Sequence, residues 1–236
     1  MSKLLWYIYF AIYLFIETII CRINILFLKK ESSKVVDEYI YKKARGIARH
    51  VLRITKTKTV VTGLENIPQQ PCVFVCNHQA IFDGFLLIAN IEPITGFIAK
   101  KEIKSYPLIG FWISAMHSVF MDRKNIREGM KAINEGVLNI NKGYSMILFP
   151  EGTRSLKSEM AEFKKGSMKL ALKAKAPIVP ITIDKTYEVL EAGNKVTGNE
   201  LTMIVHKPIF IENISEDERK NLSSILHELI KNGLNK

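Results

Sequence analysis

Two short polar segments hold the residues of this sequence whose types and spacing could do chemistry. The first contains His78 and Asp83, and the second contains Glu151 and Arg154. Each segment directly follows a strand-like apolar run. Loops at the ends of strands are where α/β proteins usually carry their chemistry. The sequence therefore predicts a site in which the first segment supplies a base and the second binds an anion.

A histidine beside a carboxylate can act as a general base. The carboxylate fixes one imidazole tautomer and stabilises the imidazolium that forms when the other nitrogen takes a proton. Such a base contributes roughly 10² to 10⁴ in rate and can activate a poor nucleophile such as an alcohol. If a substrate hydroxyl is the nucleophile, His78 and Asp83 suffice, and no covalent enzyme intermediate forms.

The spacing alone does not single out His78, because two of the five histidines have Asp five residues on: His78 with Asp83, and His117 with Asp122. Residues five apart lie about 140° apart on a helix and on opposite faces of a strand, so they meet only where the backbone turns. A turn is expected after His78, whereas residues 118–121 read as continuous strand. We predict that the His117 pair is structural. A strand-end histidine bonded only to nearby backbone remains the alternative for His78.

The second segment has the features of an anion clamp. Pro150 ends the strand, Gly152 permits unusual backbone angles, and the planar guanidinium of Arg154 suits phosphate. An ordinary polar turn is the alternative, since Glu-Gly-Thr is common in turns.

The three cysteines give little chemistry. Cys21, Cys72 and Cys76 form neither a paired disulfide set nor a usual metal spacing, so we expect reduced thiols and no metal or organic cofactor. Cys76 lies two residues before His78, which makes it a candidate nucleophile by position. It belongs to an apolar strand run, where a thiol is normally inert packing, and reactive thiols need an exposed electropositive niche.

Four blocks of the sequence, in order between residues 60 and 185, resemble the 1-acyl-sn-glycerol-3-phosphate acyltransferases (lysophosphatidic acid acyltransferases) of the glycerolipid acyltransferase superfamily. The blocks are residues 77–83; residues 99–103 through Pro107 and Gly110 to 121–123; residues 149–155 followed by 163–166, which include Lys165; and residues 179–183. The family usually has Ser two residues after the histidine, where this sequence has Ala80. That serine could cap the following helix, worth roughly 1 kcal/mol, so the departure concerns helix stability rather than catalysis.

The resemblance implies a role for each matched residue. His78 would deprotonate the free hydroxyl of a lysophospholipid while Asp83 orients it. Glu151 and Gly152 would shape the acceptor pocket, and Arg154 with Lys100 would hold the acceptor's phosphate. The implied substrate-binding residues are Lys100, Arg123, Glu151, Gly152, Thr153 and Arg154. The fourth block resembles a strand near the site and is assigned no chemistry.

The N-terminus indicates a membrane anchor. Residues 4–16 are thirteen consecutive apolar side chains; Glu17 interrupts them, and apolar character resumes to residue 28 around Arg22. A span of about 30 Å would place both charges inside the bilayer, so spanning and half-inserted arrangements both stay open. No small-residue cleavage site follows Ile20, so we expect the anchor to be retained. Lys29, Lys30 and a basic helix follow the anchor, which predicts a cell-membrane protein with its catalytic domain on the cytoplasmic side.

The segment after the anchor reads as a basic amphipathic helix. Drawn as a helix, it places Lys42, Arg45, Arg49 and Arg53 on one stripe. The apolar residues Val36, Ile40, Ala44, Ile47 and Val51 fall on the opposite side. Such a helix favours anionic lipid headgroups. A solvated helix face covering the core is the alternative.

The overall composition agrees with a membrane enzyme. The 236 residues carry 34 Lys and Arg against 23 Asp and Glu, a net charge of +11. The basic residues are dispersed without a nucleic-acid-binding signature, so acidic lipid and phosphate partners explain the excess better than nucleic acid. We expect an anchor and basic helix in residues 1–55 and one acyltransferase catalytic domain in residues 56–236.

The catalytic part alternates strands and helices, which predicts an α/β fold with a single mixed sheet flanked by helices. Strands are expected at residues 59–62, 72–76, 95–99, 118–121, 144–149, 178–183 and 201–206. Helices are expected at residues 126–140, 167–175 and 216–232, and a helical pattern begins just after residue 80.

The resemblance implies transfer of a fatty acyl group from an acyl thioester to the free 2-hydroxyl of lysophosphatidic acid, giving phosphatidic acid in phospholipid biosynthesis. The donor would be acyl-coenzyme A or an acyl carrier protein. The same chemistry on glycerol 3-phosphate or another lysophospholipid is an alternative. A non-catalytic peripheral membrane protein is a second alternative, although the intact set of His78, Asp83, Glu151 and Arg154 argues against it.

Overall fold

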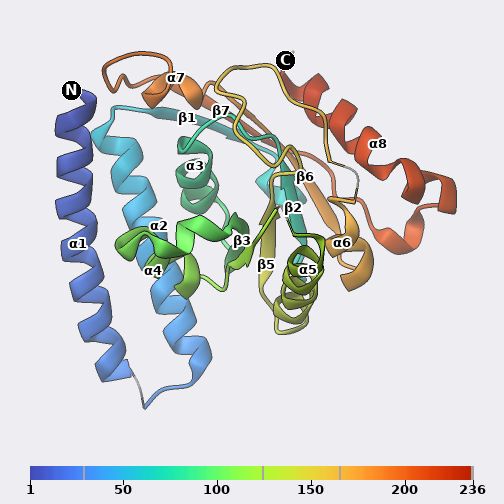
Figure 1. Cartoon of the computed structure of the whole chain (residues 1–236), viewed down its shortest axis with the longest axis horizontal. Helices are drawn as coiled ribbons and strands as arrows, with labels where there is room; N and C mark the ends of the chain where they lie inside the picture. Colours follow the sequence, from blue (N-terminus) through green and yellow to red (C-terminus); the bar gives the residue numbers. More distant parts are fainter. Residues whose placement is uncertain (29, 124, 165, 235–236) are drawn as a thin grey trace.

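The apolar runs of the sequence form a seven-stranded sheet between two layers of helices (Figure 1). The computed structural model describes residues 1–28, 30–123, 125–164 and 166–234, so Lys29 and Lys165 lie outside the described residues. In spatial order the strands are β1 (Lys58–Thr62), β7 (Glu200–Val205), β6 (Ile178–Asp184), β2 (Val73–Cys76), β5 (Ser145–Leu148), β3 (Thr95–Lys100) and β4 (Val119–Met121). Neighbouring strands run parallel except β6 and β7, which pair antiparallel. The predicted mixed sheet is confirmed, and each strand end lies within one residue of its expected position.

Both faces of the sheet are apolar because helices cover both. In β2, Phe74 and Cys76 point into one core, and Val73 and Val75 point into the other. The first core is covered by α1 (Lys3–Leu28), α2 (Ser33–Ile54), α3 (Phe82–Asn90) and α4 (Pro107–Ala115). The second is covered by α5 (Ile126–Asn141), α6 (Lys169–Ala174) and α8 (Glu216–Leu234), and the short α7 (Tyr187–Leu190) follows β6. The three helices expected after residue 120 are present.

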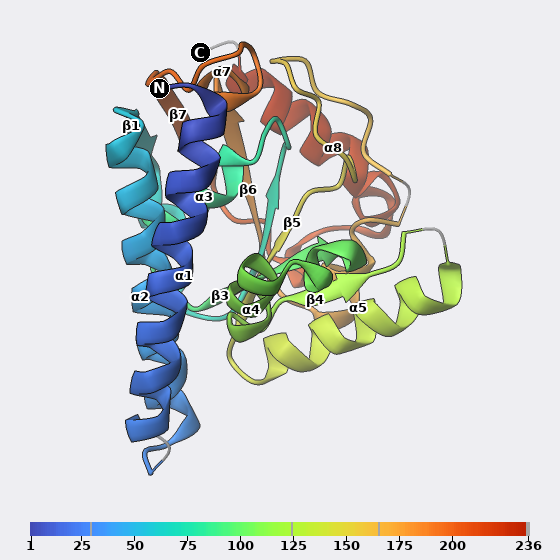
Figure 2. The ribbon, with the colours of Figure 1, turned by 60° about the vertical axis from the view of Figure 1, so that its left-hand side comes forward.

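The first two helices form an antiparallel pair along one side of the molecule (Figure 2). Within the described residues, α1 is the one helix long and apolar enough to cross a membrane, by length and composition alone. Its two charged residues contact protein. Glu17 pairs with Lys43 of α2 at 2.9 Å, and the Arg22 guanidinium lies 4.9 Å from the centre of the Phe111 ring of α4. Its exposed large apolar side chains are Leu4, Leu5, Tyr7, Ile8, Ile12, Phe15, Ile16, Ile19, Ile20, Ile23, Leu26 and Phe27.

The structure shows what covers the apolar side of the amphipathic helix α2. Its apolar side, which includes Ile40, Ala44, Ile47 and Val51, is buried in the first core. Protein therefore covers this side, as in the alternative of a helix face over the core, and only the basic side is available to lipid. Division of the chain at residue 55 stays a prediction, because α1 and α2 share that core with the sheet.

The parallel strands determine where the site can form. Strands β2, β3, β4, β5 and β6 all run in the same direction, so their carboxyl ends lie along one edge of the sheet. The His78 segment leaves β2 at this edge, and the Glu151 segment leaves the neighbouring β5 there. Ligands of open α/β sheets bind at this edge.

Candidate active site

His78 and Asp83 meet at the carboxyl edge of the sheet. The chain turns after β2, and Asp83 lies in the first turn of α3. His78 Nδ1 donates to Asp83 Oδ2 over 2.6 Å. Because Nδ1 donates its proton to the carboxylate, Nε2 is the nitrogen that can accept one. The side chain of Asp83 is fully buried, whereas that of His78 is 19% exposed. This is the geometry of an oriented general base that a substrate can reach.

The carboxylate of Asp83 is held by several donors besides His78. Its Oδ2 accepts from the backbone amides of Gln79 (2.7 Å) and Ala80 (2.9 Å), and its Oδ1 accepts from the Thr186 hydroxyl. These hydrogen bonds fix the position of the carboxylate. Ala80 contributes its backbone amide to this arrangement.

An aromatic ring sets the plane of the imidazole. Phe149, the residue just after β5, stacks on His78 with ring centroids 4.0 Å apart and ring planes 17° apart. One face of the imidazole is therefore covered. Together with the Asp83 bond, this contact restricts the direction in which Nε2 can point.

Glu151 is a buried carboxylate that joins the two polar segments. Its Oε1 accepts from the backbone amide of His78 (2.6 Å), and its Oε2 accepts from the amide of Ala161 (2.8 Å). Burial raises the pKa of this carboxyl. The Ser155 amide also donates to the His78 carbonyl (2.8 Å). Glu151 thus holds the backbone of the base, and the acceptor-pocket role implied by the resemblance stays a prediction.

Arg154 is joined through Glu191 to the loop that carries His78. Its Nη1 is 3.3 Å from Glu191 Oε1, and the amide of Ile81 donates to that same oxygen over 3.0 Å. Burial raises the pKa of the Glu191 carboxyl. The guanidinium is partly exposed and has further N–H donors for an anion.

Two more cations lie at Gly152. Arg123 Nη1 donates to the Gly152 carbonyl. Gly152 has φ +72°, and a Cβ there would lie 2.7 Å from Lys164 Nζ. The glycine therefore permits both the turn and the close approach of the lysine.

The other two predicted binding residues have fewer contacts. Lys100, at the end of β3, lies 3.6 Å from Glu102 Oε1 and is about half exposed, so it is at the right edge of the sheet but is not joined to Arg154 by any described contact. Thr153 is exposed on the loop between Gly152 and Arg154.

The rival histidine, His117, lies at the opposite edge of the sheet, just before β4. Its Nε2 is 2.9 Å from Asp37 Oδ1 of α2, and its ring stacks on Tyr144 at 3.9 Å. Asp122 pairs with Lys101 over 2.5 Å. His117 therefore joins α2 to the amino ends of β4 and β5, whereas the two polar segments lie at the carboxyl ends of the strands.

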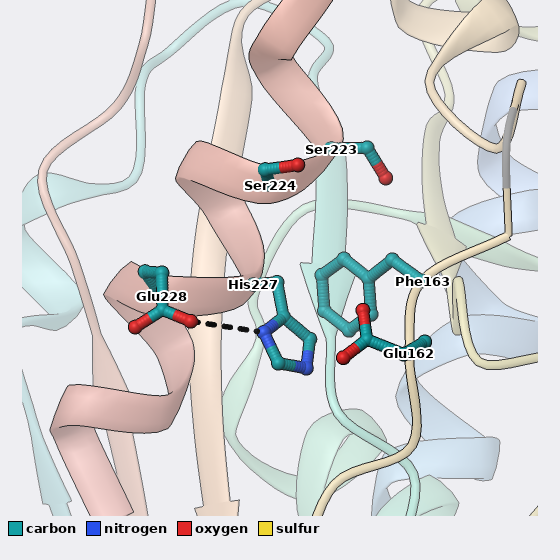
Figure 3. Close-up of a pocket in the computed structure, with 6 residues that line it drawn as sticks. All are labelled: Glu162, Phe163, Ser223, Ser224, His227 and Glu228. Atoms are coloured by element: carbon teal, nitrogen blue, oxygen red, sulfur yellow. Dashed lines mark ion pairs between the residues drawn. The ribbon is translucent and has the colours of Figure 1, made fainter.

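A second rival, His227, lines a hollow of about 160 Å³ between α8 and the loop before α6 (Figure 3). Its Nδ1 is 3.5 Å from Glu228, and its ring meets Phe163 edge-on at 5.0 Å. The lining residues are Glu162, Phe163, Ser223, Ser224, His227 and Glu228. None of them belongs to the predicted base or clamp.

The thiol nearest the site, that of Cys76, lies inside the sheet. Cys76 is completely buried, and burial raises the pKa of its thiol well above the ordinary value, which argues against it as a nucleophile. Among the described residues, no group of three or more His, Cys, Asp or Glu side chains could hold a metal ion.

The sequence and the fold both match a known protein family. Residues 58–184 match the Acyltransferase family, and the chain belongs to that family. A crystal structure of the 1-acyl-sn-glycerophosphate (LPA) acyltransferase PlsC from Thermotoga maritima superimposes with a TM-score of 0.81 at 27% identity, covering 99% of this chain and 95% of that one.

Relatives of known name point the same way. A probable 1-acyl-sn-glycerol-3-phosphate acyltransferase of Mycoplasma pneumoniae is 30% identical over 201 residues, which cover 79% of this chain and 75% of that protein. A chloroplastic 1-acyl-sn-glycerol-3-phosphate acyltransferase of Brassica napus is 36% identical over 157 residues. The chain spans only about half the length of that protein (45%) and of a 1-acyl-sn-glycerol-3-phosphate acyltransferase from Saccharomyces cerevisiae (57%).

Proposed function

We propose that this protein transfers a fatty acyl group from an acyl thioester to the free 2-hydroxyl of lysophosphatidic acid, giving phosphatidic acid for phospholipid biosynthesis. The observation that carries the proposal is the His78–Asp83 pair, with Nε2 free to accept a proton at the sheet edge that also carries Arg154. The names of the relatives support the choice of acceptor.

The chemistry follows from the position of Nε2. The imidazole takes the proton of the acceptor hydroxyl as its oxygen attacks the thioester carbonyl, and Asp83 stabilises the resulting imidazolium. The tetrahedral intermediate then expels the thiolate as its C–S bond breaks, and the imidazolium returns the proton to the sulfur. The products are the ester and the free thiol, and no residue of the protein becomes acylated.

A phosphate-bearing acceptor suits the cations on the loop after β5. Arg154 offers a planar fork of N–H donors. Lys164 of the same loop lies at Gly152, and Arg123, just after β4, donates to the Gly152 carbonyl. We propose that this loop binds the acceptor's phosphate, with Lys100 approaching from the end of β3. Acyl-coenzyme A and acyl carrier protein both remain as donors.

In this proposal the catalytic part lies on the cytoplasmic side of the cell membrane and takes the lysophospholipid acceptor from it. Trp6, near the start of α1, packs on Phe82, which directly precedes Asp83 in the chain, with ring centroids 5.9 Å apart. The apolar helix and the site therefore share one end of the molecule. Because Glu17 and Arg22 are both engaged by protein while the outer face of α1 is apolar, a half-inserted α1 fits the contacts better than a spanning one.

The test is transfer of a labelled acyl group in detergent. Purified protein is given acyl-coenzyme A or acyl carrier protein, with lysophosphatidic acid, glycerol 3-phosphate or lysophosphatidylcholine as acceptor. Phosphatidic acid from lysophosphatidic acid, lost in His78→Ala and kept in His117→Ala, is the expected result. If product formed only with glycerol 3-phosphate, that compound would replace lysophosphatidic acid as the proposed acceptor. Folded protein that is inactive with every combination of donor and acceptor would overturn the proposal.

A further inference from the structure

A basic hollow of about 480 Å³ lies away from the candidate active site, between the end of α2, the start of β1 and the end of α3. Four cations line it: Arg49, Arg53, Lys56 and Lys58. Asn90, the last residue of α3, closes it on one side, whereas Asp83 lies in the first turn of that helix. The hollow and the proposed base are therefore at opposite ends of α3.

The charge of this hollow is not neutralised by the protein. None of its nine lining residues is acidic, and no carboxylate in the described part of the chain forms an ion pair with any of the four cations. Two other cations of α2 do have acidic partners: Lys43 pairs with Glu17, and Arg45 pairs with Glu92 at 3.1 Å. Four unpaired like charges around one hollow repel one another, and a bound anion would relieve that repulsion.

Part of the hollow is already fixed in shape. Arg49 Nε donates to the carbonyl of Ala89 over 3.1 Å, and Arg53 Nη2 donates to His50 Nδ1 over 3.1 Å. Each arginine is thus tethered through one nitrogen, and its other N–H groups remain to bind an anion. Lys56 and Lys58 flank the turn into β1 and are exposed.

The hollow adjoins the apolar helix through His50. The His50 ring, which accepts from Arg53, stacks on Tyr13 of α1 with centroids 4.3 Å apart, and its Nε2 lies 2.5 Å from the hydroxyl of Tyr9. Ile8 and Ile12, beside these tyrosines in α1, are each about half exposed. A strip of exposed apolar side chains thus runs next to the cations.

From this juxtaposition we infer that the hollow is a binding site for the phosphate-bearing headgroup of an acidic phospholipid, separate from the acceptor site. This inference deepens the membrane association proposed above and rests on it. When the exposed face of α1 enters the acyl-chain region, the neighbouring cations lie at the level of the headgroups, where basic side chains meet lipid phosphates. A soluble phosphate compound would satisfy the charge but would leave the adjacent apolar strip without a role.

The site orients the enzyme as well as holding it. The apolar strip fixes the depth of α1, and an anion held at the end of α2 fixes rotation about the α1 axis. The end of α1 that packs on Phe82, next to Asp83, would then lie against the lipid from which the acceptor comes.

The test compares two double variants of the full chain. Lys56→Gln with Lys58→Gln removes two cations of the hollow, and Lys220→Gln with Lys231→Gln removes two from α8, on the opposite side of the molecule (Figure 1). Binding is measured by co-flotation with phosphatidylcholine vesicles with or without phosphatidylglycerol. We expect the hollow variant to lose about thirtyfold in affinity for the anionic vesicles and nothing for neutral ones, and the α8 variant to lose little.

Two further readouts keep the result interpretable. In the hollow variant the melting temperature should not fall, because two mutually repelling charges are removed, and acyl transfer in detergent should be unchanged. These readouts separate lost lipid binding from misfolding and from failure of the proposed reaction. An equal loss in both variants would mean diffuse attraction and would overturn the site. Equal vesicle binding by wild type and hollow variant, with inorganic phosphate raising the melting temperature of wild type alone, would make the ligand a soluble phosphate and overturn the lipid assignment.

Discussion

The buried carboxylate of Glu151 accepts the backbone amide of His78 over 2.6 Å, so the glutamate of one polar segment holds the main chain of the base in the other. The second oxygen of Glu151 accepts the amide of Ala161, in the loop that follows Arg154. One side chain therefore ties the end of β2 to the loop after β5. A displacement of His78 by about 1 Å is enough to cost roughly 10² in rate, which makes this bond a positioning contact for the proposed chemistry.

Replacement of Glu151 by Gln should therefore lower both stability and turnover. A glutamine keeps one acceptor oxygen, but its NH₂ group faces the other backbone N–H, so one buried donor loses its partner. We expect a loss of about 1–3 kcal/mol in the free energy of unfolding and a fall in kcat larger than any change in KM. Denaturant unfolding in detergent and steady-state kinetics measure the two effects. Wild-type kcat in this variant would mean that the His78 loop does not need the contact.

The pH dependence of the same variant has a definite sign. Burial raises the pKa of Glu151 in the folded protein above its ordinary value of about 4.3. The stability contributed by such a group is fully present below the ordinary pKa and is lost as pH rises through the raised one. The gap in unfolding free energy between wild type and Glu151→Gln should therefore widen when pH is lowered from 7 to 5. A gap that narrows would contradict the raised pKa.

The choice between the two His–Asp pairs can be tested by a matched pair of substitutions. His78→Ala should lower turnover by about 10² to 10⁴, because it removes the proton acceptor and leaves the fold intact. His117→Ala removes a contact to Asp37 at the other edge of the sheet and should leave kcat within a few-fold. Its cost should appear in the melting temperature instead. A loss of turnover in His117→Ala as deep as that in His78→Ala would reverse the assignment.

The sequence predicts the strands well because each is a short apolar run buried between two helical layers, and the polar residue after each run marks its end. The sequence does not predict helix α4, because its residues are apolar on all sides and lack the periodicity that marks a surface helix. The apolar stripe of α2 did not identify its own partner. An amphipathic pattern shows that one side is covered, but it does not distinguish lipid from protein.

The site was predictable only as far as local sequence extends. His78 and Asp83 are five residues apart, so the turn between them could be inferred. Thr186 and Glu191 lie more than a hundred residues from the His78 loop, at the end of β6 and just after α7, and no spacing signals their contacts with Asp83 and Ile81. These residues meet because β6 lies beside β2 in the sheet, and the order of strands cannot be predicted from any single segment.

Arg154 gives a prediction about acceptor choice. Loss of a charge-assisted bond to phosphate costs about 2 kcal/mol, so Arg154→Ala should lower kcat/KM for lysophosphatidic acid roughly thirtyfold, mainly through KM. A lysolipid without an exposed phosphate monoester should be used as before. Lys157→Ala, an exposed cation three residues further on, is the matched control. An equal loss of kcat/KM for both acceptors would show that Arg154 does not recognise the phosphate.

Thr186 tests whether the second oxygen of Asp83 matters. Its hydroxyl donates to Asp83 Oδ1, and the residue is completely buried. Valine has nearly the same shape but no donor, so Thr186→Val leaves that oxygen without this partner. The loosened carboxylate should orient His78 less well and lower kcat about tenfold, with KM nearly unchanged. Thr186→Ser keeps the donor and should restore most of the rate, whereas a purely packing role would make Val the milder change and Ser the more harmful one.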